Sequence, residues 1–105
     1  MTIYNKLVRD KIPQVISQKG ETPKTRTLGR DEFIIELNKK LQEEVDEYLA
    51  SNTLEELADI VEVIHGILAA QDKSFEILEV IRLEKKEKRG GFEERVFLES
   101  VEEGG

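Results

Sequence analysis

The sequence predicts an all-α protein built on a helical hairpin, because apolar residues recur at helical spacing on both sides of a short polar turn. The first predicted helix starts with Asp31 as its N-cap, the turn is centred on Ser51 and Asn52, and the second helix ends near Gln71. Apolar residues cover roughly 220° of the second helix, which is typical of a helix buried on two sides. We therefore expect a helical bundle completed by self-association into a homodimer or tetramer.

Two further helices are expected, one on each side of the hairpin. The segment 5–20 predicts a short helix with Pro13 in its first turn. Ser74 predicts the N-cap of a longer helix, which would end at Gly90. After that glycine the sequence alternates weakly between apolar and polar residues. It predicts one short strand at 95–99, which could pair with residues 25–28, and a frayed tail at 102–105.

The composition favours one small intracellular domain. The chain has 105 residues, a net charge of −7 and no cysteine. We expect a single domain over 1–105, and the acidic balance disfavours a nucleic-acid partner. The lack of cysteine excludes disulfides and thiolate metal sites and is compatible with a reducing cytoplasm. No stretch resembles a signal peptide or reaches ~18 apolar residues, so we expect a cytoplasmic protein without a membrane partner.

Two pairs of carboxylates lie at helical spacing on either side of the predicted turn. Glu44 and Glu47 belong to the first helix, and Glu56 and Asp59 belong to the second. In an antiparallel hairpin the two pairs sit at matching heights and can face each other. Glu56 falls inside the apolar arc of its helix, where an ionised carboxylate is costly unless a cation compensates it. Oxygen-only ligation favours Mg²⁺, with Mn²⁺ as a substitute.

Three other interpretations compete with a metal site. Glutamate-rich helices often form solvated salt-bridge ladders. Thr53 and Glu56 fit a capping box, in which the carboxylate reaches back to the start of the helix. Glu62 and His65 have the Glu-x-x-His spacing of di-iron bundles. We expect this last pair on the opposite side of the helix from Glu56, where it could not share a site with it, so a di-iron centre is disfavoured.

Basic residues gather in two segments of this acidic chain. Lys6, Arg9 and Lys11 lie close together near the amino terminus. They could form a solvated helix face or a phosphate clamp that faces the acidic site. The last turn of the predicted helix after Ser74 is also basic. Its cations could complement the helix dipole or bind an anion.

The acidic residues carry a resemblance to a known superfamily. Glu43, Glu44 and Glu47 form an EExxE motif, and Glu56 and Asp59 form an ExxD motif. Together they resemble the signature of the MazG-like, all-α nucleoside triphosphate pyrophosphohydrolases, a superfamily that includes phosphoribosyl-ATP pyrophosphohydrolase. The segments NKLVRDKIP and KRGGF resemble a small single-domain branch described as predicted house-cleaning pyrophosphatases. The link between the two acidic motifs is short for this superfamily.

The resemblance implies a Mg²⁺-dependent hydrolase that splits a nucleoside triphosphate into the monophosphate and pyrophosphate. It implies that the metal ligands are Glu44, Glu47, Glu56 and Asp59 and that the catalytic carboxylates lie among Glu43, Glu44 and Glu47. The candidates for phosphate binding are Lys40, Lys6, Arg9, Lys85 and Arg89. Two alternatives stay open: a pyrophosphohydrolase for a phosphoribosyl-type nucleotide, and a non-catalytic helical module that binds metal or nucleotide and oligomerises.

Overall fold

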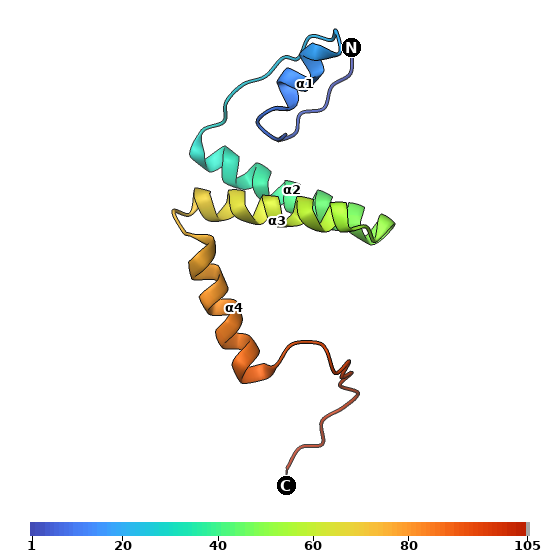
Figure 1. Cartoon of the computed structure of the whole chain (residues 1–105), viewed down its shortest axis with the longest axis vertical. Coiled ribbons are helices and arrows are strands. Elements are labelled where there is room, and N and C mark those ends of the chain that lie inside the picture. Colours follow the sequence, from blue (N-terminus) through green and yellow to red (C-terminus); the bar gives the residue numbers. More distant parts are fainter. Residues whose placement is uncertain (105) are drawn as a thin grey trace. The chain divides into compact units, whose positions relative to one another are not determined.

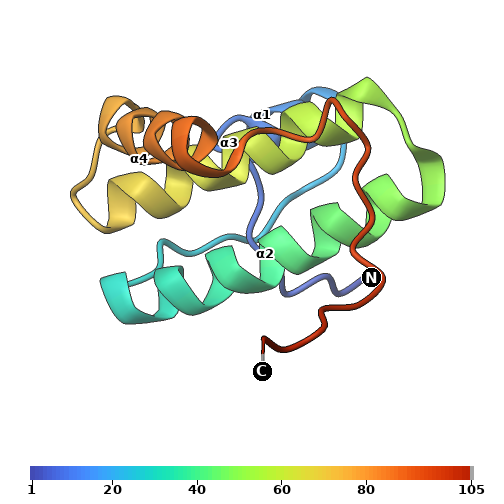
Figure 2. The same cartoon turned by 90° about the horizontal axis from the view of Figure 1, so that it is seen from below.

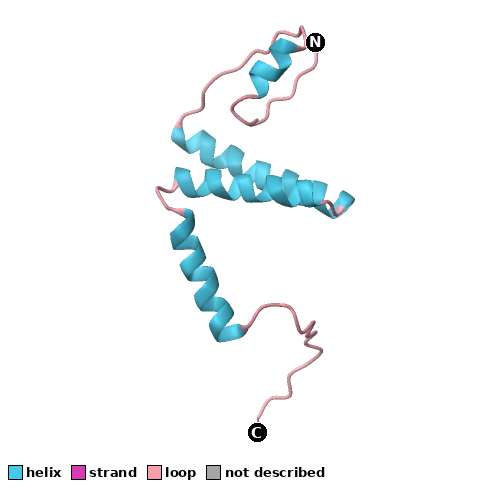
Figure 3. Ribbon diagram, viewed as in Figure 1, coloured by secondary structure: helices cyan, strands magenta, loops and turns pink. Residues whose placement is uncertain are grey.

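The computed structural model describes residues 1–104, and Gly105, the last residue of the expected tail, lies outside them. The described chain contains the helices α1 (Ile12–Gln18), α2 (Arg30–Ser51), α3 (Leu54–Ala70) and α4 (Phe75–Arg89) (Figure 1). No strand occurs in these residues (Figure 3). The predicted all-α class is therefore confirmed. In the part of the chain that is described, no helix combines the length and apolar character needed to cross a bilayer.

The chain forms two compact units. The first runs from Met1 to Lys73 and holds α1, α2 and α3, and the second starts at Ser74 and holds α4. The single domain expected over 1–105 stays a prediction. All the residues of the acidic site belong to the first unit.

The hairpin of α2 and α3 is the centre of the first unit, and the two helices lie side by side (Figures 1 and 2). Asn52 takes the left-handed conformation that ends α2, with φ 55°, and its N–H donates to the carbonyl of Tyr48. This confirms the predicted turn. Leu37 of α2 and Val63 of α3 are buried. A Cβ added at Gly66 would lie 3.0 Å from a methyl carbon of Leu37, so the glycine allows the close approach of the helices.

The amino-terminal helix is shorter than the sequence predicted. Pro13 lies in the first turn of α1 as expected, and Gly20 follows the helix with φ 85°. Lys6 and Arg9, however, precede the helix in irregular chain. Asn5 has a left-handed φ of 46°, which is incompatible with a helix running through this segment. Lys6 and Arg9 therefore lie on irregular backbone and do not form one helix face with the residues of α1.

The helix caps follow the prediction at α4 but not at α2. The hydroxyl of Ser74 accepts a hydrogen bond of 3.2 Å from the N–H of Ile77, which confirms it as the N-cap. At α2 the N-cap is Gly29, and Asp31 lies inside the first turn. The prediction of Asp31 as the cap was wrong by two positions. Its carboxylate still complements the positive end of the helix dipole from within the first turn.

Thr53 occupies the N-cap position of α3, but its side chain makes no capping hydrogen bond. Its hydroxyl lies 3.2 Å from that of Ser51 instead. One carboxylate oxygen of Glu56 is buried without any hydrogen-bond partner. The capping box is therefore not formed, and Glu56 is left for another role.

The short β pairing of 25–28 with 95–99 is not formed in the described residues, because both segments are irregular. Arg95 has a left-handed φ of 56°, which bends the chain where a strand would need to be extended. Arg26 donates two hydrogen bonds, of 2.9 and 2.5 Å, to the carboxylate of Glu32 at the start of α2. This bidentate ion pair holds residues 25–28 next to α2 as a loop.

The difference between the two caps leads to a testable expectation. Ser74→Ala removes a formed capping bond and should lower the free energy of unfolding by ~1 kcal/mol, whereas Thr53→Ala removes none and should cost a few tenths. Urea denaturation of the two variants beside the parent protein measures both values. Equal losses would contradict the assignment of the caps.

Candidate metal centre

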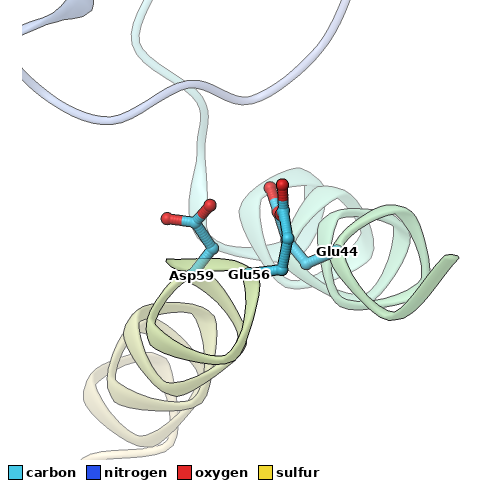
Figure 4. A group of neighbouring side chains, drawn as sticks. All are labelled: Glu44, Glu56 and Asp59. Carbon is cyan, nitrogen blue, oxygen red and sulfur yellow. The ribbon is translucent and has the colours of Figure 1, made fainter. Parts of the chain in front are cut away.

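Three carboxylates from the two hairpin helices converge on one point. Glu44 comes from α2, and Glu56 and Asp59 come from the first turns of α3. One oxygen from each lies within 4.8 Å of the others, and the side chains rise from the same side of the helix pair (Figure 4). Two oxygens on opposite sides of a hard divalent cation are separated by about 4–5 Å. The spacing therefore fits three ligands of one ion.

Two of the carboxylates each have one buried oxygen without a hydrogen-bond donor. Glu44 retains only 6% of its exposure, and Oε2 of Glu44 and Oε2 of Glu56 have no hydrogen-bond partner. A carboxylate withdrawn from water costs free energy unless a donor or a cation compensates it. Because both orphaned oxygens belong to the same cluster, a single cation would satisfy both. A solvated salt-bridge ladder does not explain them.

The electrostatics of Glu44 reflect this burial. Desolvation raises the pKa of the Glu44 carboxyl group, and the neighbouring carboxylate of Glu47 raises it further. Lys40, whose Nζ lies 3.4 Å from Oε1 of Glu44, acts in the opposite direction. In the metal-free protein the carboxyl group of Glu44 therefore holds its proton more tightly than an ordinary glutamate does. A cation bound beside it would favour the ionised form.

Ion pairs join the amino-terminal segment to this cluster. Arg9 donates a hydrogen bond of 2.6 Å to Oδ1 of Asp59. Lys6 lies 3.6 Å from Glu43, and Lys40 lies 3.4 Å from the same carboxylate oxygen. Three of the five basic residues predicted to bind phosphate are thus placed beside the acidic site. The other two, on α4, belong to the second unit.

The remaining predicted residues are less directly placed. Glu47 is exposed and interacts with Glu44, but it is not one of the three carboxylates that converge. Glu43 is held in its two ion pairs. Lys85 and Arg89 are exposed on α4. Metal ligation by Glu47 and phosphate binding by the two α4 residues stay predictions.

An open cavity of about 480 Å³ adjoins the carboxylates within the first unit. This volume is in the usual range for a small-molecule site, ~300–1,000 Å³. The amino-terminal segment forms one side of the cavity, and α2 and α3 form the other. The lining residues are Leu7, Val8, Arg9, Asp10, Lys11, Phe33, Leu37, Lys40, Glu44, Asp59, Glu62, Val63 and Gly66.

Glu62 is a cavity residue that the sequence analysis did not assign to the acidic site. We expected it on the opposite side of α3 from Glu56. It lines the same cavity as Glu44 and Asp59, and Glu56 is not among the lining residues. Glu62 follows Asp59 by three residues, and this spacing keeps two side chains on one helix face. That spacing was the signal available in the sequence. His65, the second member of the Glu-x-x-His pair, is exposed and does not line the cavity.

Comparison with known proteins adds little to this geometry. No family model matches the sequence. No solved structure matches it either. An uncharacterised protein of Mycolicibacterium smegmatis is 51% identical over 47 residues, which are 45% of this chain and 48% of the relative. The chain thus spans about half the length of this curated relative, and the function has to be argued from the site.

The burial of Glu44 predicts a specific dependence of stability on pH. Because the folded-state pKa is raised, the metal-free protein should lose stability as the pH rises from the ordinary glutamate pKa through the raised value. Glu44→Gln removes this loss. In a chelator, it should therefore raise the melting temperature by a few degrees at neutral pH and have little effect in acid, where Glu44 is protonated in both states.

Thermal denaturation at several pH values measures this effect. Glu55→Gln is the matched control, since Glu55 is an exposed carboxylate on α3 and should show no such difference. A Glu44→Gln variant that melts below the parent protein in chelator at neutral pH would contradict the interpretation.

Proposed function

We propose that this protein is a Mg²⁺-dependent hydrolase that splits a nucleoside triphosphate into the nucleoside monophosphate and pyrophosphate. The observation that carries the proposal is the pair of buried, unpartnered oxygens of Glu44 and Glu56 within one carboxylate cluster. Lysine and arginine side chains of the amino-terminal segment and α2 lie around this cluster, and the adjoining cavity has a suitable size for a small molecule. The resemblance of the EExxE and ExxD motifs supports the same reaction.

The donor set fits the proposed cofactor. It consists of carboxylate oxygens alone, which hard ions such as Mg²⁺ or Mn²⁺ prefer. Glu44, Glu56 and Asp59 would hold the ion, and we propose Glu47 as a fourth ligand. When bound, the ion supplies positive charge to phosphate oxygens and acidifies a bound water.

The basic side chains and the two other carboxylates have separate roles in the proposed reaction. Lys40, Lys6 and Arg9 bind and orient the phosphates, and each of them now pairs with a carboxylate of the site. When a phosphate binds, it replaces the carboxylate as the partner of each of these basic side chains, so that none of them is left unpaired. Glu47 is exposed beside Glu44 and is the carboxylate best placed to take a proton from the attacking water. Glu43 positions the ammonium groups of Lys6 and Lys40.

The proposal includes self-association of the chain. Among residues 1–73 the buried hydrophobic side chains are those of Leu37 and Val63. Several large apolar side chains of α2 and α3 are 40–78% exposed, namely Ile35, Leu49, Leu54, Leu57 and Val61. So small a core leaves a large apolar surface for a second copy to cover. We propose a homodimer or tetramer.

The reaction is tested by pyrophosphate release from a panel of normal, deoxy, deaminated and oxidised nucleoside triphosphates. Turnover should need Mg²⁺, stop in chelator and yield monophosphate as the other product. Glu56→Gln should reduce the rate by about a hundredfold or more and abolish the thermal shift with Mg²⁺, because it removes a metal ligand. Glu55→Gln, its exposed neighbour, should leave both unchanged.

Two outcomes would redirect the proposal. If no substrate of the panel released pyrophosphate while Mg²⁺ still raised the melting temperature, a specialist for phosphoribosyl-type nucleotides or a non-catalytic binding module would be favoured. Unchanged turnover and metal binding in Glu56→Gln would show that this carboxylate is not a metal ligand.

Self-association is tested by size-exclusion chromatography with light scattering. The parent protein should elute at a multiple of 12.1 kDa. Val61→Glu, which places a charge on the exposed apolar face of α3, should shift it toward the monomer. Gln18→Glu, on the exposed surface of α1, is the control and should not. A monomeric parent protein at micromolar concentration would contradict this part of the proposal.

A further inference from the structure

We propose that Glu62 is a specificity-determining residue, whose carboxylate accepts a hydrogen bond from an O–H or N–H group of the nucleoside part of the substrate. The inference rests on the proposed function of the same site and names the group that the cavity selects. The shared chemistry is a hydrogen-bond donor, which a nucleoside carries either on its ribose or on an amino-bearing base.

The direction of the cavity places the nucleoside near Glu62. The carboxylates of Glu56 and Asp59 lie near the hairpin turn, and Glu62 lies further along α3, roughly 9 Å beyond Glu56 at ~1.5 Å per residue. The other cavity residues of the hairpin, such as Phe33 and Gly66, also lie on the side away from the turn. Phosphates held at the carboxylate cluster would therefore leave the rest of the molecule extending toward Glu62.

The lining of this part of the cavity suits a nucleoside better than a phosphate. Leu7, Val8, Phe33, Leu37 and Val63 provide an apolar surface. Most small-molecule sites have this composition, with a few polar groups that fix the orientation of the ligand. Such a surface can receive the flat faces of a base.

Two carboxylates of this cavity, Glu62 and Asp10, are unengaged within the described chain, and Glu62 is the one that lies on the hairpin. Asp59 and Glu44 are occupied by Arg9 and Lys40. Glu62, by contrast, has no ion pair or hydrogen bond to any of residues 1–104. It is also not one of the three carboxylates that converge on the metal position. Its side chain is therefore available to a ligand.

The chemistry of a carboxylate limits what Glu62 can contact. An ionised carboxylate is purely a hydrogen-bond acceptor and repels phosphate. It accepts from a ribose hydroxyl or from the amino group of a base, and it disfavours a carbonyl oxygen at the same place. When a ligand analogue lacks the donor, its binding leaves the carboxylate without a hydrogen bond. The site therefore discriminates strongly against that analogue.

Calorimetric binding of non-hydrolysable nucleoside triphosphate analogues in Mg²⁺ tests the proposal. One pair of probes compares ribose with 2′-deoxyribose, and the other compares a cytosine with a uracil base. In one of the two pairs, the parent protein should bind the member with the 2′-hydroxyl or the exocyclic amino group about tenfold or more tightly than its partner. Glu62→Gln, whose amide can both donate and accept, should bring that preference within about twofold. Glu55→Gln should keep it.

Each outcome has a definite meaning. Glu62→Asp keeps the carboxylate on a shorter stem and should retain part of the preference, which separates chemistry from misfolding. An unchanged preference in Glu62→Gln, no preference in the parent protein, or no nucleotide binding at all would overturn the role of Glu62. Loss of the Mg²⁺ thermal shift in Glu62→Gln would overturn it too, because the residue would then serve the metal. Selective binding without hydrolysis would support Glu62 while contradicting the proposed reaction.

Discussion

The approach of Glu44 and Glu56 across the hairpin is the constraint on which the rest of the first unit depends. Each carboxylate has a buried oxygen without a hydrogen-bond partner, at a contact between helices where apolar side chains would normally pack. Replacing such groups with apolar residues would relieve a desolvation cost. A fold that tolerates this cost in two facing residues is consistent with a site built for a cation, which compensates both carboxylates at once.

The hairpin turn makes this arrangement possible. The left-handed Asn52 ends α2 abruptly, and α3 begins only two residues later. The short connection brings the carboxylates of Glu44 and Glu56 close together from adjacent helices (Figure 4). A longer loop would allow the helices to slide past each other. Gly66, further along α3, keeps the helices in close contact around Leu37.

The amino-terminal segment completes the candidate site on α2 and α3. Its basic side chains are drawn to the acidic face of the hairpin, where Arg9 pairs with Asp59 and Lys6 pairs with Glu43. These pairs are partly exposed, so each contributes little to stability. Their importance lies in position, because they hold the wall of the cavity next to the carboxylates. The same cations are then available to a phosphate that displaces their present partners.

The sequence by itself determined the features that depend on neighbours along the chain. Helical periodicity located the hairpin and its turn, the Ser74 cap was visible from its position, and the i, i+3 spacing indicated that Glu56 and Asp59 share a face. The tertiary structure decided what depends on distant contacts. Arg9 and Asp59 are 50 residues apart, and no local pattern shows that they meet. Their contact places the cavity over α3, and it is this cavity that brings Glu62 into the site.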